Sequence, residues 1–262
     1  DVGDESALER HQDLFQATVN TQGAPVIGAA LVVKDGRISL VSAAGMSIGS
    51  KAQISARADA SPGVPTVSLD AGGDLAIAQG ARIEASTATG AALVRLDSKG
   101  NLVVAGDVLA LGGTAAGSVV HVSGGPVAVA ASGSLRVDGS LADAGSSITI
   151  ASASDLVLDG RITALGAGFI TQNGTAVPAA DAGVALGDGG KVIVLAAGDV
   201  RFGSAGVIDA SGASGGDIYL VAQRDLSMAD GASVFSRGTI GPGGFLELSG
   251  HRTVDFGLIK LD

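Results

Sequence analysis

Several residue types that normally stabilise a globular protein are absent or rare in this chain. Its 262 residues contain no cysteine, no tryptophan and a single tyrosine, Tyr219, and aromatic residues make up only 3%. The absence of cysteine excludes a disulfide-stapled scaffold and a thiolate metal site, and it suits a protein that is unfolded during export. Because aromatic side chains are scarce, aliphatic ones must fill the core.

Basic residues and long apolar runs are also scarce. The chain has 16 Lys and Arg against 26 Asp and Glu, a net charge of −10, which disfavours binding to nucleic acid or to anionic membranes. No apolar run approaches the roughly 18 to 20 residues that span a bilayer, so no membrane insertion is expected. The chain starts at Asp1 without a signal peptide, as a mature or excised fragment would. Its 46% hydrophobic content argues against disorder.

One short pattern recurs along the chain. It reads apolar-x-apolar, four or five turn residues that often end in Asp, and apolar-x-apolar again, as in Val67–Ile77. The second apolar pair begins at Met46, Leu75, Leu102, Val127, Leu156, Val200, Leu226 and Val254. The gaps are 29, 27, 25, 29, 44, 26 and 28, so six of the seven lie within two residues of 27. The gap of 44 predicts an insertion of roughly 17 residues.

A third short apolar segment follows most pairs, and a turn rich in Gly, Ala and Ser then closes the repeat. These segments are Ala52–Ala56, Ala81–Ala85, Val108–Leu111, Leu135–Val137, Ile162–Ala164, Val207–Ala210 and Val234–Ser236. Alternation with a period of two predicts strands with one inward face, and three strands per repeat of about 27 residues predict a stacked parallel coil. We therefore expect an all-β parallel β-helix of about eight coils over residues 31–262, after a lead-in over 1–30.

Three segments near residue 200 carry a resemblance to a known family. They are Ala-Gly-Asp-Val at 197–200, Ile-Asp-Ala-Ser-Gly at 208–212 and Gly-Gly-Asp-Ile-Tyr-Leu at 215–220. They resemble the coils of filamentous-haemagglutinin-type exoproteins, which are long bacterial adhesins exported by two-partner secretion. The resemblance covers residues 31–262 and implies a right-handed β-helix, an outer-membrane secretion partner, a secreted or cell-surface location, and adhesion or matrix building. Autotransporter passenger domains share this coil pattern.

The amino-terminal segment has the pattern of a helix. Over residues 5–19, one helical face collects Leu8, His11, Phe15 and Val19. Ser6 and Glu9 have the spacing of a capping box. We expect a helical cap over the first coil; the alternatives are a segment that docks on a neighbouring subunit through Leu8 and Phe15, or a frayed tail.

The carboxy-terminal segment reads as a coil without a polar cap. Its apolar residues include Leu246, Leu248, Leu258 and Leu261. A strand edge left open in this way invites pairing with another chain. We expect either a truncated longer solenoid or a stacking surface through which copies assemble end to end.

The long gap places the insertion at about residues 166–190, which include Phe169 and Asn173. Loops that leave a solenoid often carry its function. This one is interpreted either as a plain or lattice-contacting loop or as a recognition loop.

Aspartate recurs just before the second strand of the repeat, at Asp74, Asp155, Asp199 and Asp225, with Asn101 at the equivalent position. Stacking would align these residues along one edge. We expect each carboxylate to bind local backbone N–H groups and so form the corner. A second hypothesis is a Ca²⁺-binding ladder, because carboxylates about 4.8 Å apart repel one another and hard cations prefer oxygen ligands. No other cofactor is expected.

Catalytic equipment is not apparent. His11, His121 and His251 lack the spacing of a metal site, and no nucleophile motif stands in a strand–turn–helix context. Arg95, Arg136, Arg201 and Arg224 could line one face, but the aromatic platforms of sugar-cleaving β-helices are missing. We therefore expect a non-enzymatic segment of a secreted fibre or matrix filament, or alternatively an adhesin module that presents the insertion to a host or neighbouring cell.

Overall fold

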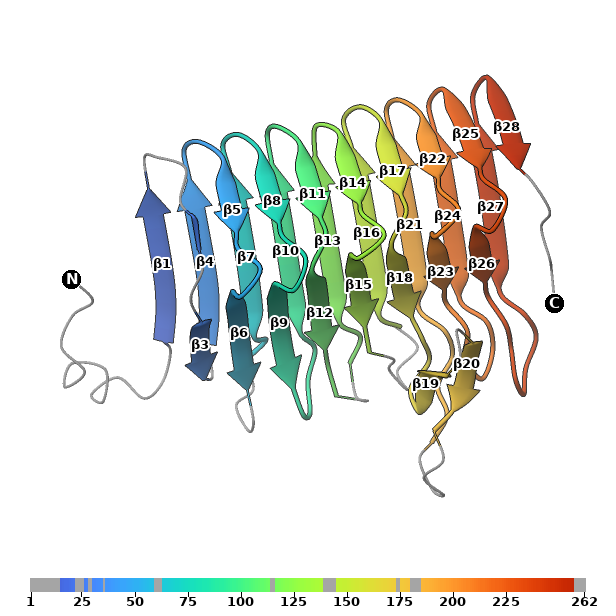
Figure 1. Ribbon diagram of the computed structural model, residues 1–262. Helices are drawn as coiled ribbons and strands as arrows, with labels where there is room; N and C mark the ends of the chain where they lie inside the picture. Colours follow the sequence, from blue (N-terminus) through green and yellow to red (C-terminus); the bar gives the residue numbers. More distant parts are fainter. Residues whose placement is uncertain are drawn as a thin grey trace.

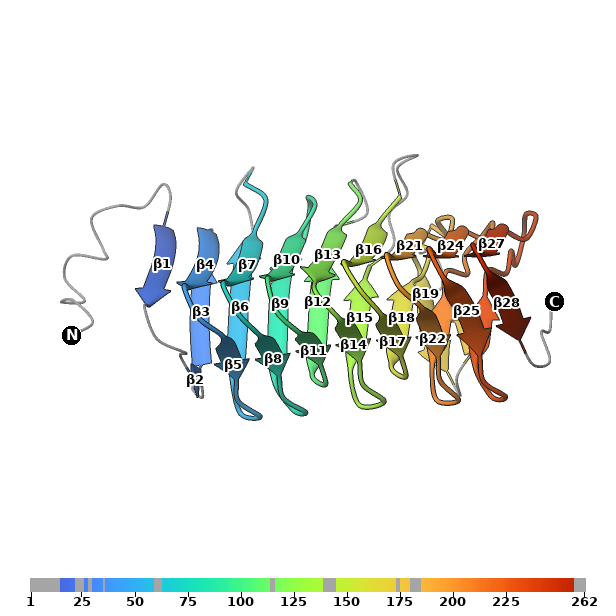
Figure 2. The ribbon, with the colours of Figure 1, turned by 90° about the horizontal axis from the view of Figure 1, so that it is seen from above.

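The chain winds into a β-solenoid built from three parallel sheets. In the described residues there is no helix, and so none that could cross a membrane. Figure 1 shows equivalent strands of successive coils side by side, from β1 at one end to β28 at the other, and the view from above shows the coils following a single axis (Figure 2). The predicted parallel β-helix with three short strands per coil is confirmed. The computed structural model describes residues 15–21, 26–27, 30–34, 36–58, 63–113, 116–138, 145–172, 175–179 and 185–256.

Two nine-stranded sheets carry the two apolar pairs of the repeat. The first consists of β1 (Phe15–Thr21), β4 (Gly36–Ser42), β7 (Thr66–Ala71), β10 (Leu93–Ser98), β13 (Val119–Gly124), β16 (Ser147–Ser152), β21 (Lys191–Ala196), β24 (Asp217–Ala222) and β27 (Phe245–Gly250). The second consists of β2 (Val26–Ile27), β5 (Met46–Ile48), β8 (Leu75–Ile77), β11 (Leu102–Val104), β14 (Val127–Val129), β17 (Leu156–Leu158), β22 (Val200–Phe202), β25 (Asp225–Met228) and β28 (Thr253–Phe256).

The third sheet carries the short segment that closes each coil. Its eight strands are β3 (Ala30–Lys34), β6 (Gln53–Ala58), β9 (Arg82–Thr87), β12 (Asp107–Leu111), β15 (Ser134–Val137), β18 (Arg161–Ala164), β23 (Val207–Asp209) and β26 (Ser233–Phe235). The insertion follows β18 and forms an antiparallel hairpin from β19 (Phe169–Gln172) and β20 (Thr175–Pro178). The predicted interruption at residues 166–190 is therefore a hairpin attached to an otherwise regular rod.

Aliphatic side chains stacked in register form the core. Leu75 and Val194, which the alternation places inside, are 1% and 0% exposed, whereas the outward Ser39 is partly exposed. Because inward and outward residues alternate, a slip of one residue would turn every strand inside out, so the pattern fixes the register. One row of the first sheet is fully buried and consists of Ile38, Val67, Val94, Val120, Ile148, Val192 and Ile218.

Two corners between the second and third sheets require glycine. Gly80 and Gly231 have φ angles of 85° and 96°, which L-residues rarely adopt. A Cβ at Gly80 would lie 2.8 Å from the carbonyl oxygen of Ser50 in the preceding coil. These glycines let the chain turn sharply while the coils remain closely stacked.

The predicted amino-terminal helix is wrong where the structure describes it. Residues 15–19 belong to strand β1, which pairs with β4 in a parallel register from Phe15–Gly36 to Thr21–Ser42. Phe15, Ala17 and Val19 also fit a period of two, and the edge of β4 offers unpaired backbone groups that a strand satisfies and a helix does not. The solenoid thus includes strands before residue 31, and residues 5–14 lie outside the described part of the chain.

Candidate functional site

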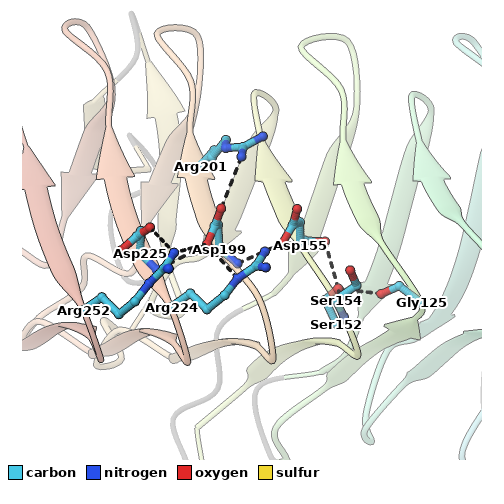
Figure 3. Close-up of polar contacts among 9 residues, drawn as sticks. All are labelled: Gly125, Ser152, Ser154, Asp155, Asp199, Arg201, Arg224, Asp225 and Arg252. Carbon is cyan, nitrogen blue, oxygen red and sulfur yellow. Dashed lines mark hydrogen bonds and ion pairs between the residues drawn. The ribbon is translucent and has the colours of Figure 1, made fainter.

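The recurrent aspartates line one edge of the rod, where the first sheet turns into the second. Each immediately precedes or begins a strand of the second sheet, and the pairing of those strands stacks their positions in register. Asp155, Asp199 and Asp225 come from consecutive coils and form the continuous part of this row (Figure 3). Asp74 and Asn101 form a separate pair nearer the amino-terminal end.

Each of these carboxylates accepts a hydrogen bond from the next coil. Asp74 Oδ1 accepts the N–H of Asn101 at 2.8 Å, and Asp155 Oδ1 accepts the N–H of Asp199 at 3.0 Å. Asp199 Oδ1 accepts the N–H of Asp225 at 3.3 Å. These aspartates do bind backbone N–H groups, but the expectation that the groups are local is wrong, because they belong to the neighbouring coil. The carboxylates therefore connect coils as well as shaping turns.

Arginine side chains supply the positive charge along this row. Arg224 contacts Asp155 and places its Nε 3.0 Å from Asp199 Oδ1. Arg252 lies 2.5 Å from Asp225 Oδ2 (Figure 3). Guanidinium groups thus offset the carboxylate repulsion that motivated the calcium hypothesis. Among the described residues, no group of three or more His, Asp or Glu side chains is arranged to hold a metal ion.

These contacts alter the acidity of two ladder carboxyls. The backbone N–H of Asp199, together with Arg224 and Arg201, lowers the pKa of Asp155. The hydroxyl of Thr253, which donates to Asp225 Oδ1 at 2.9 Å, lowers the pKa of Asp225 together with Arg252. Both carboxyls are therefore held in the charged form that the inter-coil bonds require.

The hairpin β19–β20 is attached to the rod by a small core and by backbone bonds. Phe169, Leu165 and Ala176 form an apolar cluster separate from the main core, with Leu186 packed against it. The N–H of Gly166 donates to Ser211 O at 2.9 Å, which ties the base of the insertion to the next coil. The hairpin is thus anchored to the rod near β18 and β23 of the third sheet (Figure 1).

A groove of about 670 Å³ lies between the hairpin and the outer face of the third sheet. Arg82, Arg136 and Arg161 form part of its lining, together with Asp107 and Asp138. From the hairpin side come residues 165–171, among them Phe169 and the 47% exposed Ile170. A second cavity of about 380 Å³ shares Gly112 and Asp138 with the groove, so the hollow continues along the rod.

Most charged groups in the groove are already paired. Arg82 Nε donates to Glu84 Oε2 at 2.8 Å, and Arg136 Nη2 donates to Asp138 Oδ1 at 2.8 Å. Arg161 Nη1 is buried without a hydrogen-bond partner, and the positive charge of Arg161 acts on the buried carboxyl of Asp209 on the paired strand β23.

Two buried carboxyls lie on the third sheet. Burial raises the pKa of Glu84, but its bonds to Arg82 and Ser86 and the nearby Arg57 outweigh that effect, so the net shift is downward. Burial raises the pKa of Asp209, and this effect outweighs the opposing bonds to Ser211 and the nearby charges of Arg237 and Arg161. Asp209 is fully buried, and its Oδ2 has no hydrogen-bond partner among the described residues. Asp209 Oδ1 accepts the N–H of Ser211 at 3.0 Å.

The groove was not predicted from the sequence, although a signal was present. The Arg-Ile pairs at 82–83 and 161–162 stand at the same position of the third strand, and strand pairing places both arginines in one row. The four arginines considered for a common face do not all share one, although Arg201 and Arg224 both contact Asp199. Arg95 lies in β10 of the first sheet, Arg136 in β15 of the third, and Arg201 in β22 of the second.

The carboxy-terminal coil is the least covered part of the described rod. Leu246 and Leu248 in β27 are partly buried and pack against the main core. Phe245, Val254 and Phe256 are 51%, 38% and 46% exposed. Among the described residues, no strand lies beyond β26, β27 and β28 in the three sheets.

The remaining residues predicted for assembly or binding are only partly located. Phe15 lies in β1 at the opposite end of the rod, and Phe169 packs in the hairpin core and also lines the groove. Leu8, Asn173, Leu258 and Leu261 lie outside the described residues. Their proposed roles stay predictions.

Comparisons with protein-family models, with curated proteins and with solved structures find no match for this chain.

Proposed function

We propose that this chain is a structural, non-enzymatic segment of a secreted bacterial surface fibre, in which coils of neighbouring copies stack end to end. The resemblance of residues 197–220 to filamentous-haemagglutinin-type exoproteins supports secretion to the cell surface through an outer-membrane partner. A stiff rod with repeated coils is suited to span distance, because every coil uses the same register and contacts mainly its neighbours.

The observation that carries this proposal is the uncovered carboxy-terminal coil. No strand in the described part of the chain pairs with the outer edges of β26, β27 and β28, and Phe245, Val254 and Phe256 in this coil are exposed. Inside the rod, Leu226, which is the position paired with Val254, is covered by the next coil and is fully buried. A further coil, supplied by a second copy, would pair the backbone groups of the outer edges and bury the apolar side chains at about 25 cal/mol per Å².

Light scattering over increasing protein concentration tests the stacking. We expect mass to grow with concentration for the natural sequence and to stay monomeric for Leu248→Lys, which places a charge on the inward face of the end coil. Ser249→Lys is the matched control, because Ser249 belongs to the same strand but alternates to the outer face. A monomer at all concentrations, or equal assembly of both variants, would overturn stacking through this coil.

An adhesin module is the second proposal, and the hairpin β19–β20 favours it. It interrupts an otherwise regular rod and exposes Ile170 beside the groove. Binding of the purified protein to host or bacterial cells would be measured for Ile170→Asp and for Val103→Asp, an exposed position on the second sheet. Loss of binding by the first variant alone would support adhesion through the hairpin, and equal binding by both would exclude it.

A further inference from the structure

The outward side chains of the first sheet change character along the rod. From β4 to β24, the middle outward row is first polar and then apolar, and it reads Ser39, Ser68, Arg95, His121, Thr149, Ile193 and Tyr219. From β7 to β24, the next outward row changes in the same way and reads Asp70, Asp97, Ser123, Ala151, Leu195 and Val221. Both rows become apolar at β21, the first strand after the hairpin.

This apolar region and two charged neighbours form what we call the lateral face, which consists of Lys191, Ile193, Leu195, Asp217, Tyr219 and Val221. Leu195 is 42% exposed, and Lys191 Nζ lies 4.8 Å from the centre of the Tyr219 ring. The outward face of a sheet that is packed on one side is normally polar. A contiguous apolar area rimmed by charged groups is typical of a contact with another protein.

The pattern of the lateral face is complementary to itself. Neighbouring strands β21 and β24 pair as Lys191–Asp217, Ile193–Tyr219 and Leu195–Val221. A two-fold axis that runs parallel to the strands, midway between β21 and β24, lays β21 of each copy over β24 of the other. Lys191 then faces the partner's Asp217, and the apolar side chains face apolar side chains. A second copy of this chain therefore supplies the complement of every group on the face.

The adjoining strands are compatible with this arrangement. The same axis lays β27 over the partner's β16, and the facing positions are Phe245 and Ser147, Glu247 and Thr149, and Ser249 and Ala151. None of these contacts brings like charges together. The axis also keeps the strands of the two copies parallel, as in sheets that pack face to face about 10 Å apart.

We propose that the lateral face joins two copies of this chain side by side, with their rod axes antiparallel. Four overlapping strands about 4.8 Å apart, with five residues each at about 3.3 Å, cover about 300 Å². A standard complex buries about 800 Å² per partner, so a single contact of this kind is weak. In the proposed fibre the contact recurs in every copy, and linked contacts reinforce one another. That reinforcement rests on the proposed function, whereas the contact itself does not.

Sedimentation equilibrium on Leu248→Lys, which should not stack end to end, isolates the lateral contact. We expect a concentration-dependent dimer at physiological ionic strength, where the Debye length is about 8 Å. Lys191→Asp and Asp217→Lys, each added to Leu248→Lys, should weaken the dimer at least fivefold, because each variant sets like charges opposite one another. An equimolar mixture of the two should restore the dimer, since the acidic copy then faces the basic copy at both charged contacts.

An apolar position provides a second comparison. Leu195→Asp should also weaken the dimer at least fivefold, because it places a carboxylate opposite the partner's Val221. Val103→Asp is the matched control, since Val103 is 38% exposed on the second sheet, and its dimer should be unchanged. In electron micrographs, filaments of the natural sequence should lie in side-by-side bundles, and filaments of Lys191→Asp should lie singly.

Three results would overturn the lateral contact. The first is a monomer at millimolar concentration while the protein melts cooperatively, which would leave the face to a partner other than this chain. The second is equal association of Leu195→Asp and Val103→Asp. The third is a mixture of Lys191→Asp and Asp217→Lys that associates no better than either variant alone. Failure of the natural sequence to form filaments would count against stacking and leaves the dimer measurement intact.

Discussion

One corner residue, Asp199, joins three coils through its backbone N–H and its carboxylate. Its N–H donates to Asp155 in the preceding coil, and its Oδ1 accepts the N–H of Asp225 in the following one. Arg224 and Arg201 contact the same carboxylate at 3.0 and 3.2 Å. The Asp199 side chain is only 15% exposed. If it is truncated, water therefore cannot easily take the place of the lost carboxylate as a hydrogen-bond acceptor.

Asp199→Ala should therefore lower the free energy of unfolding by about 1–3 kcal/mol, since it leaves the N–H of Asp225 and the guanidinium of Arg201 without their acceptor, whereas Arg224 keeps its contact with Asp155. Urea denaturation measures this change. Asp230→Ala, at an exposed turn, is the matched control and should change stability by less than about 0.5 kcal/mol. Equal stability of the two variants would contradict the inter-coil role of the corner aspartates.

The same ladder predicts how stability depends on pH. Asp155 and Asp225 have folded pKa values below their ordinary value of 3.8, so their contribution is present above about pH 4 and is lost as pH falls through the folded pKa. The melting temperature of the natural sequence should exceed that of Asp155→Asn/Asp225→Asn at pH 6, and the difference should shrink towards pH 3. Taking the difference cancels Asp209, whose raised pKa acts in the opposite direction. If the difference in melting temperature grew as the pH fell, the predicted direction of the pH dependence would be wrong.

At the scale of the strand, the loss of stability caused by a substitution depends on whether the side chain points into the core or towards solvent. Leu75 in β8 is 1% exposed and is surrounded by apolar side chains, whereas Ser39 in β4 points outward. Leu75→Asp should cost more than about 3 kcal/mol, because it buries a carboxylate without a partner. Ser39→Asp should be nearly neutral. Thermal melts of the two variants compare them, and similar losses would show that the facing is misassigned.

The elements that repeat were predictable, and those that do not repeat were not. Val67, Leu69, Leu75 and Ile77 show the alternation of inward residues, and its recurrence predicts the three strands of each coil. Phe15 and Val19 fit a helical and a strand pattern equally, and the open edge of β4 decided in favour of the strand. The edge of β4 is part of the tertiary structure, and the local periodicity of the sequence cannot predict it.

The candidate site was predictable only in part for the same reason. The row of Asp155, Asp199 and Asp225 follows from the repeat, but their N–H partners lie one coil away and require the register. Asp155 and Arg224 lie 69 residues apart in sequence. The groove requires both the register of the third sheet and the position of the hairpin, so its lining became visible only in three dimensions.

At the scale of the whole molecule, stability is distributed over many similar coils. Each coil adds a few buried aliphatic side chains and a set of inter-coil backbone bonds, so the rod resembles a stack held by nearest-neighbour contacts. The corner charges are balanced within the protein by Arg224, Arg252 and Arg201. This internal balance bears on the calcium hypothesis.

Removal of divalent cations should leave the melting temperature unchanged, because arginines compensate the carboxylates of the ladder. Calorimetric scans with EDTA and with added Ca²⁺ measure this. The pair Asp74 and Asn101, which lacks an arginine ion pair among the described residues, is the place to look if calcium raises the melting temperature. In that case Asp74→Asn should abolish the increase, and the calcium ladder would replace the arginine account.

Fibre diffraction from aligned, concentrated protein tests coil-on-coil stacking most directly. The account predicts filaments with a strong reflection near 4.8 Å along the fibre axis, since strands of successive coils lie across that axis at the spacing of a β-sheet. It also predicts that Leu248→Lys forms no filaments under the same conditions, while Ser249→Lys does. Filaments without the axial reflection, or a protein that stays monomeric when concentrated, would contradict the proposal that one copy's end coil continues in the next.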